Sequence, residues 1–565
     1  MELIIDGFPI TAKPDQTLLE LLNLLGLNSE NFNERPIAAK IAGEVFNLNY
    51  VPVRQKDVAT DRVSVRRAMA ASEGKVNLLR FTDPAGKDVY TRTAWFVIFL
   101  ALHRLWPTAR AKMNCTVGNA LYIEVRHDDF SVDALKYEVD KIIHEDIPLI
   151  RRRSKRVDAE KRYYDNGRMD VSRLLSWRTE DYFDEYTYAT FGDYYYGELA
   201  PSTGYVQVWE ILPAEGGFMF LFPDDSTLNA VAAYKQMPKF LSVSTEGERW
   251  CELMECETIA DLNEMVSNGN IRELIRVNEA LHEKQFSQVA DLICSRGAKA
   301  VMLAGPSSSG KTTSANRLAT QLKVHGMKPV LISLDDYYID RDQIQPGPDG
   351  KLDLEHINTI DTDLFREHME LLLCGNEVEL PTFNFKTGHR EWHGHKLSLS
   401  EKSVLIVEGL HALNPILLPG KLDADLVFKL YVSPLLPLNL DDHNRIPTTL
   451  LRLLRRTVRD YETRGASVQN TMQMWDSVRR GEKRWIYPFQ ENADYILNSS
   501  TLYELAVLKK HIFPLLTAIQ PEEECYEAVR AVVKVLNYVL EADVDDEIPP
   551  TSLVREFIGG NSFYR

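Results

Sequence analysis

The chain has 565 residues, of which 44% are hydrophobic and 26% charged, and its formal net charge is −17. A chain of this length exceeds what one compact core holds, so we expect about two to four domains. The acidic balance disfavours sequence-blind nucleic-acid binding by the whole surface, because such binding relies on broad positive charge.

The sequence carries no sign of secretion or of a membrane span. No apolar run is long enough to cross a bilayer, and the N-terminus has the acidic residues Glu2 and Asp6 in place of a basic region. The six cysteines include no CxxC pair, which argues against a disulfide framework or a structural zinc site. We therefore expect a cytoplasmic protein without a membrane partner.

Residues 1–60 are predicted to form a small β-grasp module. Strands are expected at 1–6, 8–12, 37–41 and 45–53, and a helix at 18–25 between the capping residue Thr17 and Gly26. The stretch Ala38–Val53, AAKIAGEVFNLNYVPV, resembles the TGS domain that begins threonyl-tRNA synthetases. The resemblance implies the same β-grasp fold here.

Residues 61–240 are predicted to form an α+β domain. A helix is expected at 93–105 and strands at 111–116, 120–125 and 205–211, the last after the stretch Pro201–Gly204, PSTG. This order resembles the second additional domain of threonyl- and alanyl-tRNA synthetases, which edits mischarged tRNA. The metal-binding HxxxH and CxxxH positions of that family fall on residues that cannot do the same work, namely Arg92, Phe96, Tyr195 and Leu199. The resemblance therefore implies the fold without the editing chemistry.

Two features of this segment favour an RNA-binding alternative. One is the basic run Arg151–Arg156, and the other is a cluster of aromatic residues between Tyr182 and Tyr196. The competing interpretation is a solvated basic face and aromatic rings that pack in a core, which the acidic net charge favours. A nucleic-acid partner is accordingly the disfavoured alternative.

Residues 241–298 are predicted to be a helical linker. Apolar residues recur at helical spacing, and a helix at 271–295 leads into the next strand. We place the domain boundary near Asn268–Asn270.

The stretch Ala300–Thr313, AVMLAGPSSSGKTT, joins an apolar run to the pattern G-x-x-x-x-G-K-[ST]. That pattern predicts a P-loop, in which backbone N–H groups and the N-terminus of the following helix hold phosphate oxygens. The residues expected to bind ATP are Gly305, Ser307, Ser308, Ser309, Gly310, Lys311, Thr312 and Thr313. Lys311 is expected to reach the β- and γ-phosphates, and the Thr312 hydroxyl to bind Mg²⁺.

Acidic residues follow two of the apolar runs in residues 299–520, the predicted kinase domain. Strands are expected at 329–334, 404–407, 426–432 and 494–497, and the helical stretches between them predict a parallel sheet with helices on both faces. Asp335 and Glu408 directly follow the first two strands, and ligands of such sheets bind at the carboxyl ends of strands. We expect one carboxylate to take the acceptor's proton and the other to hold Mg²⁺.

Arginines gather in residues 452–465, at Arg452, Arg455, Arg456, Arg459 and Arg464. One interpretation is a lid that closes on the transferred phosphate. The other is an amphipathic surface helix with its arginines paired to Asp460 and Glu462. We favour the lid, because the stretch lies downstream of the Glu408 strand, where P-loop kinases place closing segments.

Several motifs in a fixed order give a closer resemblance. They are GPSSSGKTT at 305–313, SLDDYY at 333–338, LEHINTID at 354–361, ELPTFNFKTGHR at 379–390, IVEGLHAL at 406–413, RRTVRDYETRG at 455–465 and ADYILNSS at 493–500. In these motifs, residues 301–519 resemble the uridine kinase and phosphoribulokinase family. The resemblance implies that Asp335 is the general base and Glu408 the carboxylate associated with Mg²⁺. It also implies a lid with Arg455, Arg459 and Arg464, and places Arg390 in the loop that flanks the nucleoside.

The chain departs from this family in the nucleoside pocket. Glu355 stands where uridine kinases carry an Asp that holds ribose hydroxyls, and the pyrimidine-reading Tyr and His fall on Phe383 and Gly388. Phe383 keeps a stacking surface but lacks the phenolic donor, and His389 is the substitute next to Gly388. The predicted substrate-binding residues are therefore Glu355, Phe383, His389 and Arg390. A metal site at the three histidines between 389 and 395 is disfavoured, because no carboxylate or cysteine completes it at a usual spacing.

These observations predict an ATP- and Mg²⁺-dependent kinase that phosphorylates the 5′-hydroxyl of uridine or a related nucleoside. The predicted fold class is α/β, a P-loop NTPase parallel-sheet kinase domain preceded by the β-grasp and α+β domains. A helical tail at 521–565 carries no identifiable chemistry. Two alternatives stay open: a P-loop kinase acting on a sugar phosphate or other small alcohol, and an RNA- or tRNA-binding regulator that uses the P-loop as a nucleotide sensor. We expect a homo-oligomer.

Overall fold

The computed structural model describes residues 1–52, 72–223, 227, 230–345, 353–418 and 424–563. The expected domain boundary at residues 60 and 61 lies outside these ranges. The chain forms two compact units: unit 1 comprises residues 1–236, 258–260 and 439–445, and unit 2 comprises residues 237–257, 261–438 and 446–565. Within the described ranges, no helix combines the length and the apolar character that a membrane span requires.

Unit 1 begins with a five-stranded sheet of order β2-β1-β5-β3-β4. Its strands are β1 (Glu2–Ile5), β2 (Phe8–Thr11), β3 (Ala38–Ile41), β4 (Glu44–Phe46) and β5 (Lys75–Leu79). Helix α1 (Leu18–Leu25) shares one apolar core with these strands, and Thr17 and Glu20 form a capping box at its start. Because β5 pairs with both β1 and β3, the sheet extends beyond residue 60, where the module was expected to end.

The rest of unit 1 is α+β. A four-stranded sheet of order β11-β12-β7-β6 contains β6 (Arg110–Val117), β7 (Ala120–Arg126), β11 (Glu210–Ala214) and β12 (Gly217–Leu221), and a three-stranded sheet of order β10-β9-β8 contains β8 (Arg151–Lys155), β9 (Tyr182–Tyr188) and β10 (Phe191–Asp193). The helices are α3 (Pro84–Leu105), α4 (Val132–Glu145), α5 (Arg156–Asp165) and α6 (Met169–Ser176). The strand predicted at 205–211 is wrong over its first part, since Thr203–Tyr205 is a 3₁₀ turn and β11 begins at Glu210.

The segment Asn439–Arg445 belongs to unit 1, although it lies in the middle of the predicted kinase domain. It contains β19 (Asn439–Asp441) and β20 (Asn444–Arg445). The His443 ring stacks on Phe99 with centroids 3.6 Å apart, and its Nδ1 lies 2.6 Å from Oδ2 of Asp193. Residues 299–520 therefore do not form one uninterrupted unit, which corrects the expected domain division.

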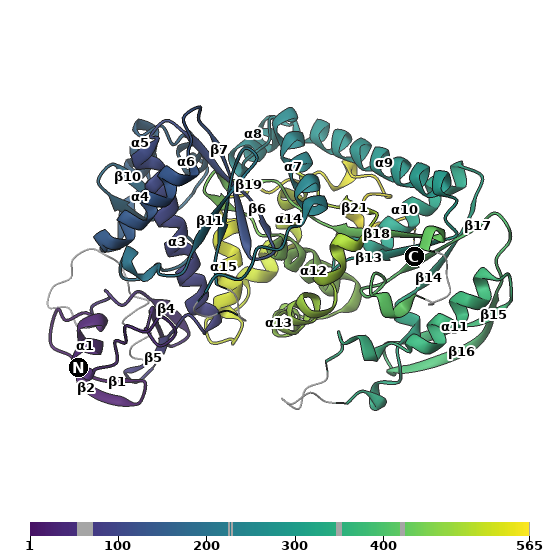
Figure 1. Ribbon diagram of the computed structural model, residues 1–565, viewed down its shortest axis with the longest axis horizontal. Helices are drawn as coiled ribbons and strands as arrows, with labels where there is room; N and C mark the ends of the chain where they lie inside the picture. The colour runs from purple at the N-terminus through teal and green to yellow at the C-terminus, as the bar shows by residue number, and fades with distance from the viewer. Residues whose placement is uncertain (53–71, 224–226, 228–229, 346–352, 419–423, 564–565) are drawn as a thin grey trace. The chain divides into compact units, whose positions relative to one another are not determined.

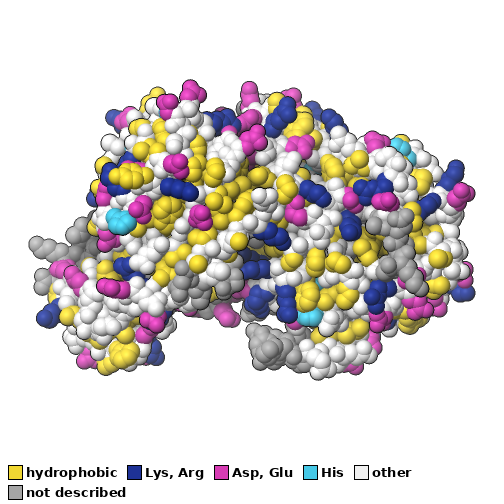
Figure 2. Space-filling model, viewed as in Figure 1, with side chains coloured by type: hydrophobic (Ala, Val, Ile, Leu, Met, Phe, Trp, Pro, Cys, Tyr) yellow, Lys and Arg dark blue, Asp and Glu magenta, His cyan; other side chains and the backbone are white. Residues whose placement is uncertain are grey.

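The basic run of unit 1 is engaged in ion pairs. Arg151 and Arg153 on β8 both contact Asp184 on β9, and Arg151 also lies 2.9 Å from Glu198. Most of the aromatic cluster is buried, including Phe183, Tyr186, Phe191, Tyr194 and Tyr195. Figure 2 shows Lys and Arg side chains interspersed with Asp and Glu over much of the visible face. Contacts within unit 1 thus account for Arg151, Arg153 and most of the aromatic rings, whereas Arg152 and Lys155 are exposed.

Unit 2 is built on a parallel five-stranded sheet of order β14-β17-β13-β18-β21 (Figure 1). Its strands are β13 (Ala300–Ala304), β14 (Lys328–Ser333), β17 (Ser403–Glu408), β18 (Val427–Ser433) and β21 (Tyr495–Asn498). Every neighbouring pair in this sheet is parallel, which confirms the predicted α/β architecture. The hairpin of β15 (Val378–Asn384) and β16 (His389–Leu397) is separate from the sheet.

Helices cover both faces of this sheet. Helices α9 (Ile271–Arg296) and α10 (Lys311–Val324) share the core of one face, and α11 (Thr362–Leu373) shares that of the other. The other helices from residue 238 on are α7 (Pro238–Leu253), α8 (Ile259–Asn268), α12 (Thr448–Arg464), α13 (Val468–Trp485), α14 (Glu504–Thr517), α15 (Tyr526–Leu536) and α16 (Arg555–Ile558). Alternate residues of β13 enter different cores: Val301 and Leu303 pack with α9 and α10, whereas Met302 packs with α11. Unit 2 starts at Met237 and includes the expected linker at 241–298 except residues 258–260, so residues 268–270 lie within this unit.

Candidate active site

The P-loop joins β13 to α10 at the carboxyl end of the central strand. Gly305 has no room for a side chain, since a Cβ there would lie 2.2 Å from the carbonyl oxygen of Val432. Gly310 has a φ of 88°, in the left-handed region, and turns the loop into the helix. In the described part of the chain, the buried hydroxyls of Ser308 and Ser309 have no hydrogen-bond partner. Such hydroxyls beside a helix N-terminus fit a phosphate group.

Acidic residues reach the P-loop from two adjacent strand ends. Strands β14 and β17 lie side by side, with Ser333 opposite Glu408. The hydroxyls of Thr312 and Ser333 each donate to Oε1 of Glu408 at 3.4 Å. Asp335 lies in the 3₁₀ turn Leu334–Tyr337, directly after β14. Thr312 and Glu408, the expected Mg²⁺ ligands, are therefore in contact.

Burial dominates the electrostatics of these groups. It lowers the pKa of Lys311, although Glu408 and Asp335 act in the opposite direction. It raises the pKa of Asp335, against the charges of Lys311, Arg464 and Arg459. Burial, followed by the charge of Asp335, also raises the pKa of Glu408 to about 7. The charges of the lysine and of both carboxylates thus shift one another's pKa in a partly buried site.

The arginines of α12 divide into two sets. Arg455 is fully buried, and its guanidinium donates to Glu504 and to the carbonyl oxygen of Ser499, each at 2.7 Å. Arg459 and Arg464 lie near the end of the helix, where their charges lower the pKa of Asp335. The Arg464 side chain is 59% exposed. Because Arg455 is buried and paired with Glu504, its position fits neither the predicted lid nor the predicted surface helix. The end of α12, with Arg459 and Arg464, does lie near Asp335.

Glu482 on α13 supports the P-loop, and no motif predicted it. Its Oε1 accepts a hydrogen bond from the backbone N–H of Ser307 at 2.9 Å, and its side chain pairs with Arg452. Arg452 also donates to the Ser307 carbonyl at 2.9 Å, and Arg456 donates to the Ser307 hydroxyl at 2.9 Å. Ser307, expected to bind ATP, is therefore held by protein groups on three of its atoms.

Glu355 is brought close to the P-loop. Burial, followed by the charge of Glu482, raises its pKa to about 7, and the charges of Asp335 and Lys311 also act on it. A second side chain here is His411, which no sequence pattern singled out. Burial lowers the pKa of His411 to about 4, so the ring is neutral at pH 7.

The β15–β16 hairpin carries the other predicted substrate residues. Phe383 is buried, and its ring lies 5.5 Å from that of Tyr338. Arg390 donates to Asp361 at 3.0 Å and to the carbonyl oxygens of Tyr337 and Tyr338 at 3.3 and 3.1 Å. Arg390 therefore fastens the hairpin to the turn after β14.

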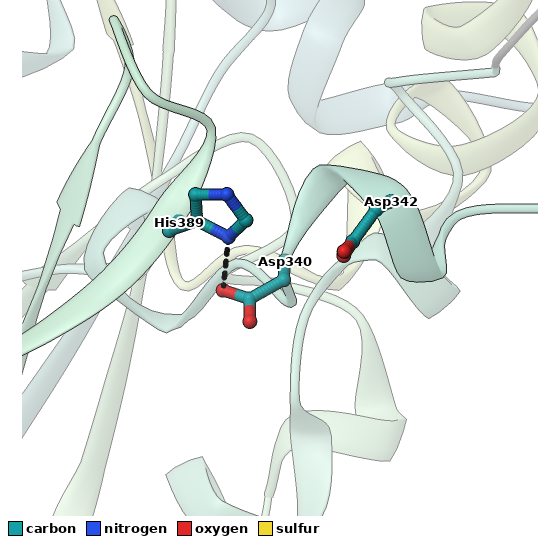
Figure 3. A group of neighbouring side chains, drawn as sticks. All are labelled: Asp340, Asp342 and His389. Atoms are coloured by element: carbon teal, nitrogen blue, oxygen red, sulfur yellow. Dashed lines mark ion pairs between the residues drawn. The ribbon is translucent and has the colours of Figure 1, made fainter.

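His389, also on this hairpin, points toward Asp340 (Figure 3). Its Nδ1 lies 3.6 Å from Oδ1 of Asp340, and Asp342 offers a third possible metal ligand nearby. The carboxylates that the histidine run lacks in sequence are thus supplied by the fold. Asp340 already accepts a hydrogen bond from the backbone N–H of Arg390 at 2.8 Å. Because the group is largely exposed and Asp340 has this structural role, we assign it no metal.

Glu556, from the C-terminal tail, also reaches the P-loop. Its Oε2 accepts a hydrogen bond from the backbone N–H of Thr313 at 3.1 Å. The tail was expected to carry no chemistry, and its distance from the P-loop in sequence hides this contact.

Comparisons with known proteins give a family match to the part of the chain that contains the P-loop. Residues 300–505 match the model of the phosphoribulokinase / uridine kinase family. A uridine kinase of Vibrio atlanticus (strain LGP32) is 30% identical over 221 residues, which are 38% of this chain and 95% of that protein. A uridine kinase of Staphylococcus haemolyticus (strain JCSC1435) is 29% identical over 206 residues, 36% of this chain and 89% of that protein. The crystal structure of a putative fructose transport system kinase from Silicibacter sp. TM1040 covers 38% of this chain and 98% of its own, with 19% identity and a TM-score of 0.28.

Replacing Arg455 with methionine is expected to destabilise the protein, because the charge of Glu504 would stay buried without its partner. Breaking such a pair costs about 3–5 kcal/mol. The matched control, Arg464→Met, removes an exposed arginine of the same helix and is expected to cost less than about 0.5 kcal/mol. Thermal unfolding followed by circular dichroism makes the comparison. An Arg455→Met protein that unfolds like wild type but has lost turnover would instead make Arg455 a phosphate-binding residue.

Glu355→Gln is expected to make the stability of the ligand-free protein less sensitive to a rise in pH from about 4.5 to about 7. A carboxyl group with a raised pKa keeps its proton in the folded state at pH values where the unfolded chain has lost it. Its stabilising effect is full below the ordinary pKa of 4.5 and is lost as the pH rises through about 7.

The free energy of unfolding of Glu355→Gln, relative to wild type, should therefore rise by up to about 3 kcal/mol between pH 4.5 and 8.5. Urea denaturation across this pH range measures the difference. Glu367→Gln, which alters an exposed carboxylate on α11, is the control. If the difference in free energy of unfolding between Glu355→Gln and wild type is the same at pH 4.5 and pH 8.5, the raised pKa is contradicted.

Proposed function

The chain belongs, through residues 300–505, to the phosphoribulokinase / uridine kinase family, and from that premise we propose that it transfers the γ-phosphate of ATP to the 5′-hydroxyl of uridine or a related nucleoside. The chain is a phosphotransferase with an alcohol acceptor. The observation that carries the proposal is the meeting of Lys311, Asp335 and Glu408 at the ends of adjacent parallel strands.

ATP is assigned to the P-loop. The N-terminus of α10 and the hydroxyls of Ser308 and Ser309 supply donors for phosphate oxygens, and Lys311 supplies a buried positive charge. Thr312 and Glu408 would hold Mg²⁺ through a hydroxyl and a carboxylate oxygen, the type of ligand that this ion prefers. When bound, the ion neutralises charge on the phosphate oxygens.

Asp335 is assigned the role of general base. Its raised pKa makes it a better proton acceptor near neutral pH than an ordinary aspartate, so it can take the proton of the attacking hydroxyl. Arg459 and Arg464, whose charges reach Asp335, stabilise the negative charge of the group in transfer. Arg455 acts differently in this proposal, by holding α12 against Glu504.

The acceptor is assigned to the space beside Glu355 and Phe383. The Glu355 carboxylate offers two oxygens to ribose hydroxyls, and Phe383 offers an apolar face to a base. His389 lies on the same hairpin and carries a side chain that is about half exposed. Arg390, bonded to Asp361, positions the hairpin in this proposal.

A second candidate is a kinase for a sugar phosphate or another small alcohol. It is favoured by the chemistry of the hairpin: Phe383 has no phenolic donor, and Arg390 is engaged by three protein groups. Fewer polar groups remain to discriminate a pyrimidine. The RNA-binding alternative loses part of its support, because Arg151 and Arg153 of β8 are paired within unit 1.

Unit 1 is assigned no catalysis. The resemblance to TGS and editing domains stays a prediction, and in the editing comparison the ligand position Arg92 donates through Nε to the carbonyl oxygen of Glu198. A guanidinium group in that place cannot ligate a metal ion.

Acceptor choice is tested by offering the purified protein ATP, Mg²⁺ and a panel of nucleosides, sugar phosphates and hydroxy acids. Release of ADP is followed with a coupled assay. The proposal expects the highest kcat/KM with uridine or another nucleoside. Turnover with a sugar phosphate alone would replace it with the second candidate.

Asp335→Asn is expected to lower kcat by about two to four orders of magnitude while ATP still binds, as loss of a general base requires. The matched control is Asp336→Asn on the same turn, whose carboxylate accepts a hydrogen bond from the Phe383 backbone at 3.3 Å. An amide oxygen can keep that bond, so this variant should lose less than about tenfold. Equal turnover of Asp335→Asn and wild type would exclude Asp335 as the base.

A further inference from the structure

Glu556 and Asn561, near the end of the described chain, contact the N-terminal end of α10. Glu556 Oε2 accepts the backbone N–H of Thr313 at 3.1 Å, and Asn561 Nδ2 donates to the Thr313 hydroxyl at 3.3 Å. The Thr313 N–H is one of the first donors of α10, which have no partner within the helix. In a P-loop these are the donors that phosphate oxygens use.

The contact is part of a packed structure. We call residues Ser552–Asn561 the C-terminal hook. Leu553, Val554 and Phe557 of the hook are completely buried, and a Cβ on Gly310 would lie 3.3 Å from the Leu553 side chain. The Arg455 guanidinium lies 4.8 Å from the centre of the Phe557 ring. The hook therefore rests on the P-loop and on α12.

Polar bonds give the hook its shape. Arg555 donates to the carbonyl oxygens of Ile548 and Gly559, at 2.9 and 3.3 Å. The Ser552 hydroxyl donates to Oε1 of Glu279 at 2.7 Å. These bonds hold the backbone around Glu556 in a turn and so aim its carboxylate at α10.

Glu556 also changes the charge of the site. It adds to the negative potential that raises the pKa of Glu408, after burial and Asp335, and it favours the charged form of Lys311. Three carboxylates thus act on one lysine when no nucleotide is present. A triphosphate would bring further negative charge to the same N–H groups, and like charges at such distances repel strongly where water is scarce.

We propose that the C-terminal hook is a built-in competitor of ATP: the Glu556 carboxylate occupies a donor of the P-loop helix that a nucleotide phosphate takes, and nucleotide binding moves the hook off the P-loop. This inference rests on the proposed nucleotide site. The hook would therefore weaken ATP binding, because part of the free energy of ATP binding is used to displace it.

Glu556→Gln tests the competition with little change of shape. The amide keeps an oxygen for the Thr313 N–H but removes the charge, and hydrogen bonds to charged groups are stronger than those to neutral ones. The dissociation constant of MgATP, measured by titration calorimetry on the full chain, is therefore expected to fall about tenfold. The matched control is Glu547→Gln, a tail carboxylate that pairs with Arg272 and Arg276 and is expected to leave the constant unchanged.

The binding results distinguish failure of the hook proposal from failure of the proposed nucleotide site. Equal or weaker MgATP binding by Glu556→Gln, with wild-type binding intact, overturns the hook and leaves the proposed function standing. No MgATP binding by either protein overturns the nucleotide site, and with it both proposals.

Limited proteolysis of the wild-type protein gives a second measurement that needs no folded variant. Trypsin can cut after Arg555 only when the hook has left its carbonyl contacts. Addition of MgATP is expected to accelerate this cut severalfold, as seen by mass spectrometry of the shortened chain. Protection of Arg555 by MgATP would mean that the nucleotide tightens the hook, which contradicts the proposal.

Discussion

Burial of an ammonium group governs the site of unit 2. The Lys311 side chain is partly buried, which lowers its pKa, and the carboxylates of Asp335 and Glu408 offset this effect only in part. The same burial raises the pKa of both carboxylates. Charges of both signs thus lie together in a partly buried site, and in our proposal a phosphate group with its metal ion pairs with them.

A second set of charges keeps the loop in place. Arg452 pairs with Glu482 and Arg455 with Glu504, and all four side chains are fully buried. Both arginines also donate to carbonyl oxygens of the P-loop, at Ser307 and Ser308. An arginine-rich helix that reads as a lid in sequence is, over its first turns, an internal support of the phosphate site.

The parts of the site that the sequence predicts are those that local patterns encode. Apolar runs of strand length that end in Asp335 or Glu408 identify the strands, and the carboxyl-end rule of parallel sheets brings the two acids together. The structure bears this out, with Ser333 opposite Glu408 in adjacent strands. The family match covers residues 300–505, the segment that contains both acids.

The parts that the sequence hides depend on distant contacts. Glu482 and Glu556 are ordinary helical acids in sequence, and only the fold brings them to Ser307 and Thr313. The burial of Arg455 cannot be read from its charge, because its partner Glu504 lies in another helix. Residues 439–445 belong to unit 1, and nothing in the composition of this segment indicates that assignment.

The central claim is that Lys311 and its neighbouring carboxylates move a phosphate from ATP to an alcohol. The most direct test follows the phosphorus itself by ³¹P NMR, with ATP, Mg²⁺ and uridine in the presence of the protein. We expect a phosphate monoester signal coupled to the 5′ protons of the nucleoside, growing in step with ADP. Growth of inorganic phosphate alone would show that water is the acceptor and would contradict the claim.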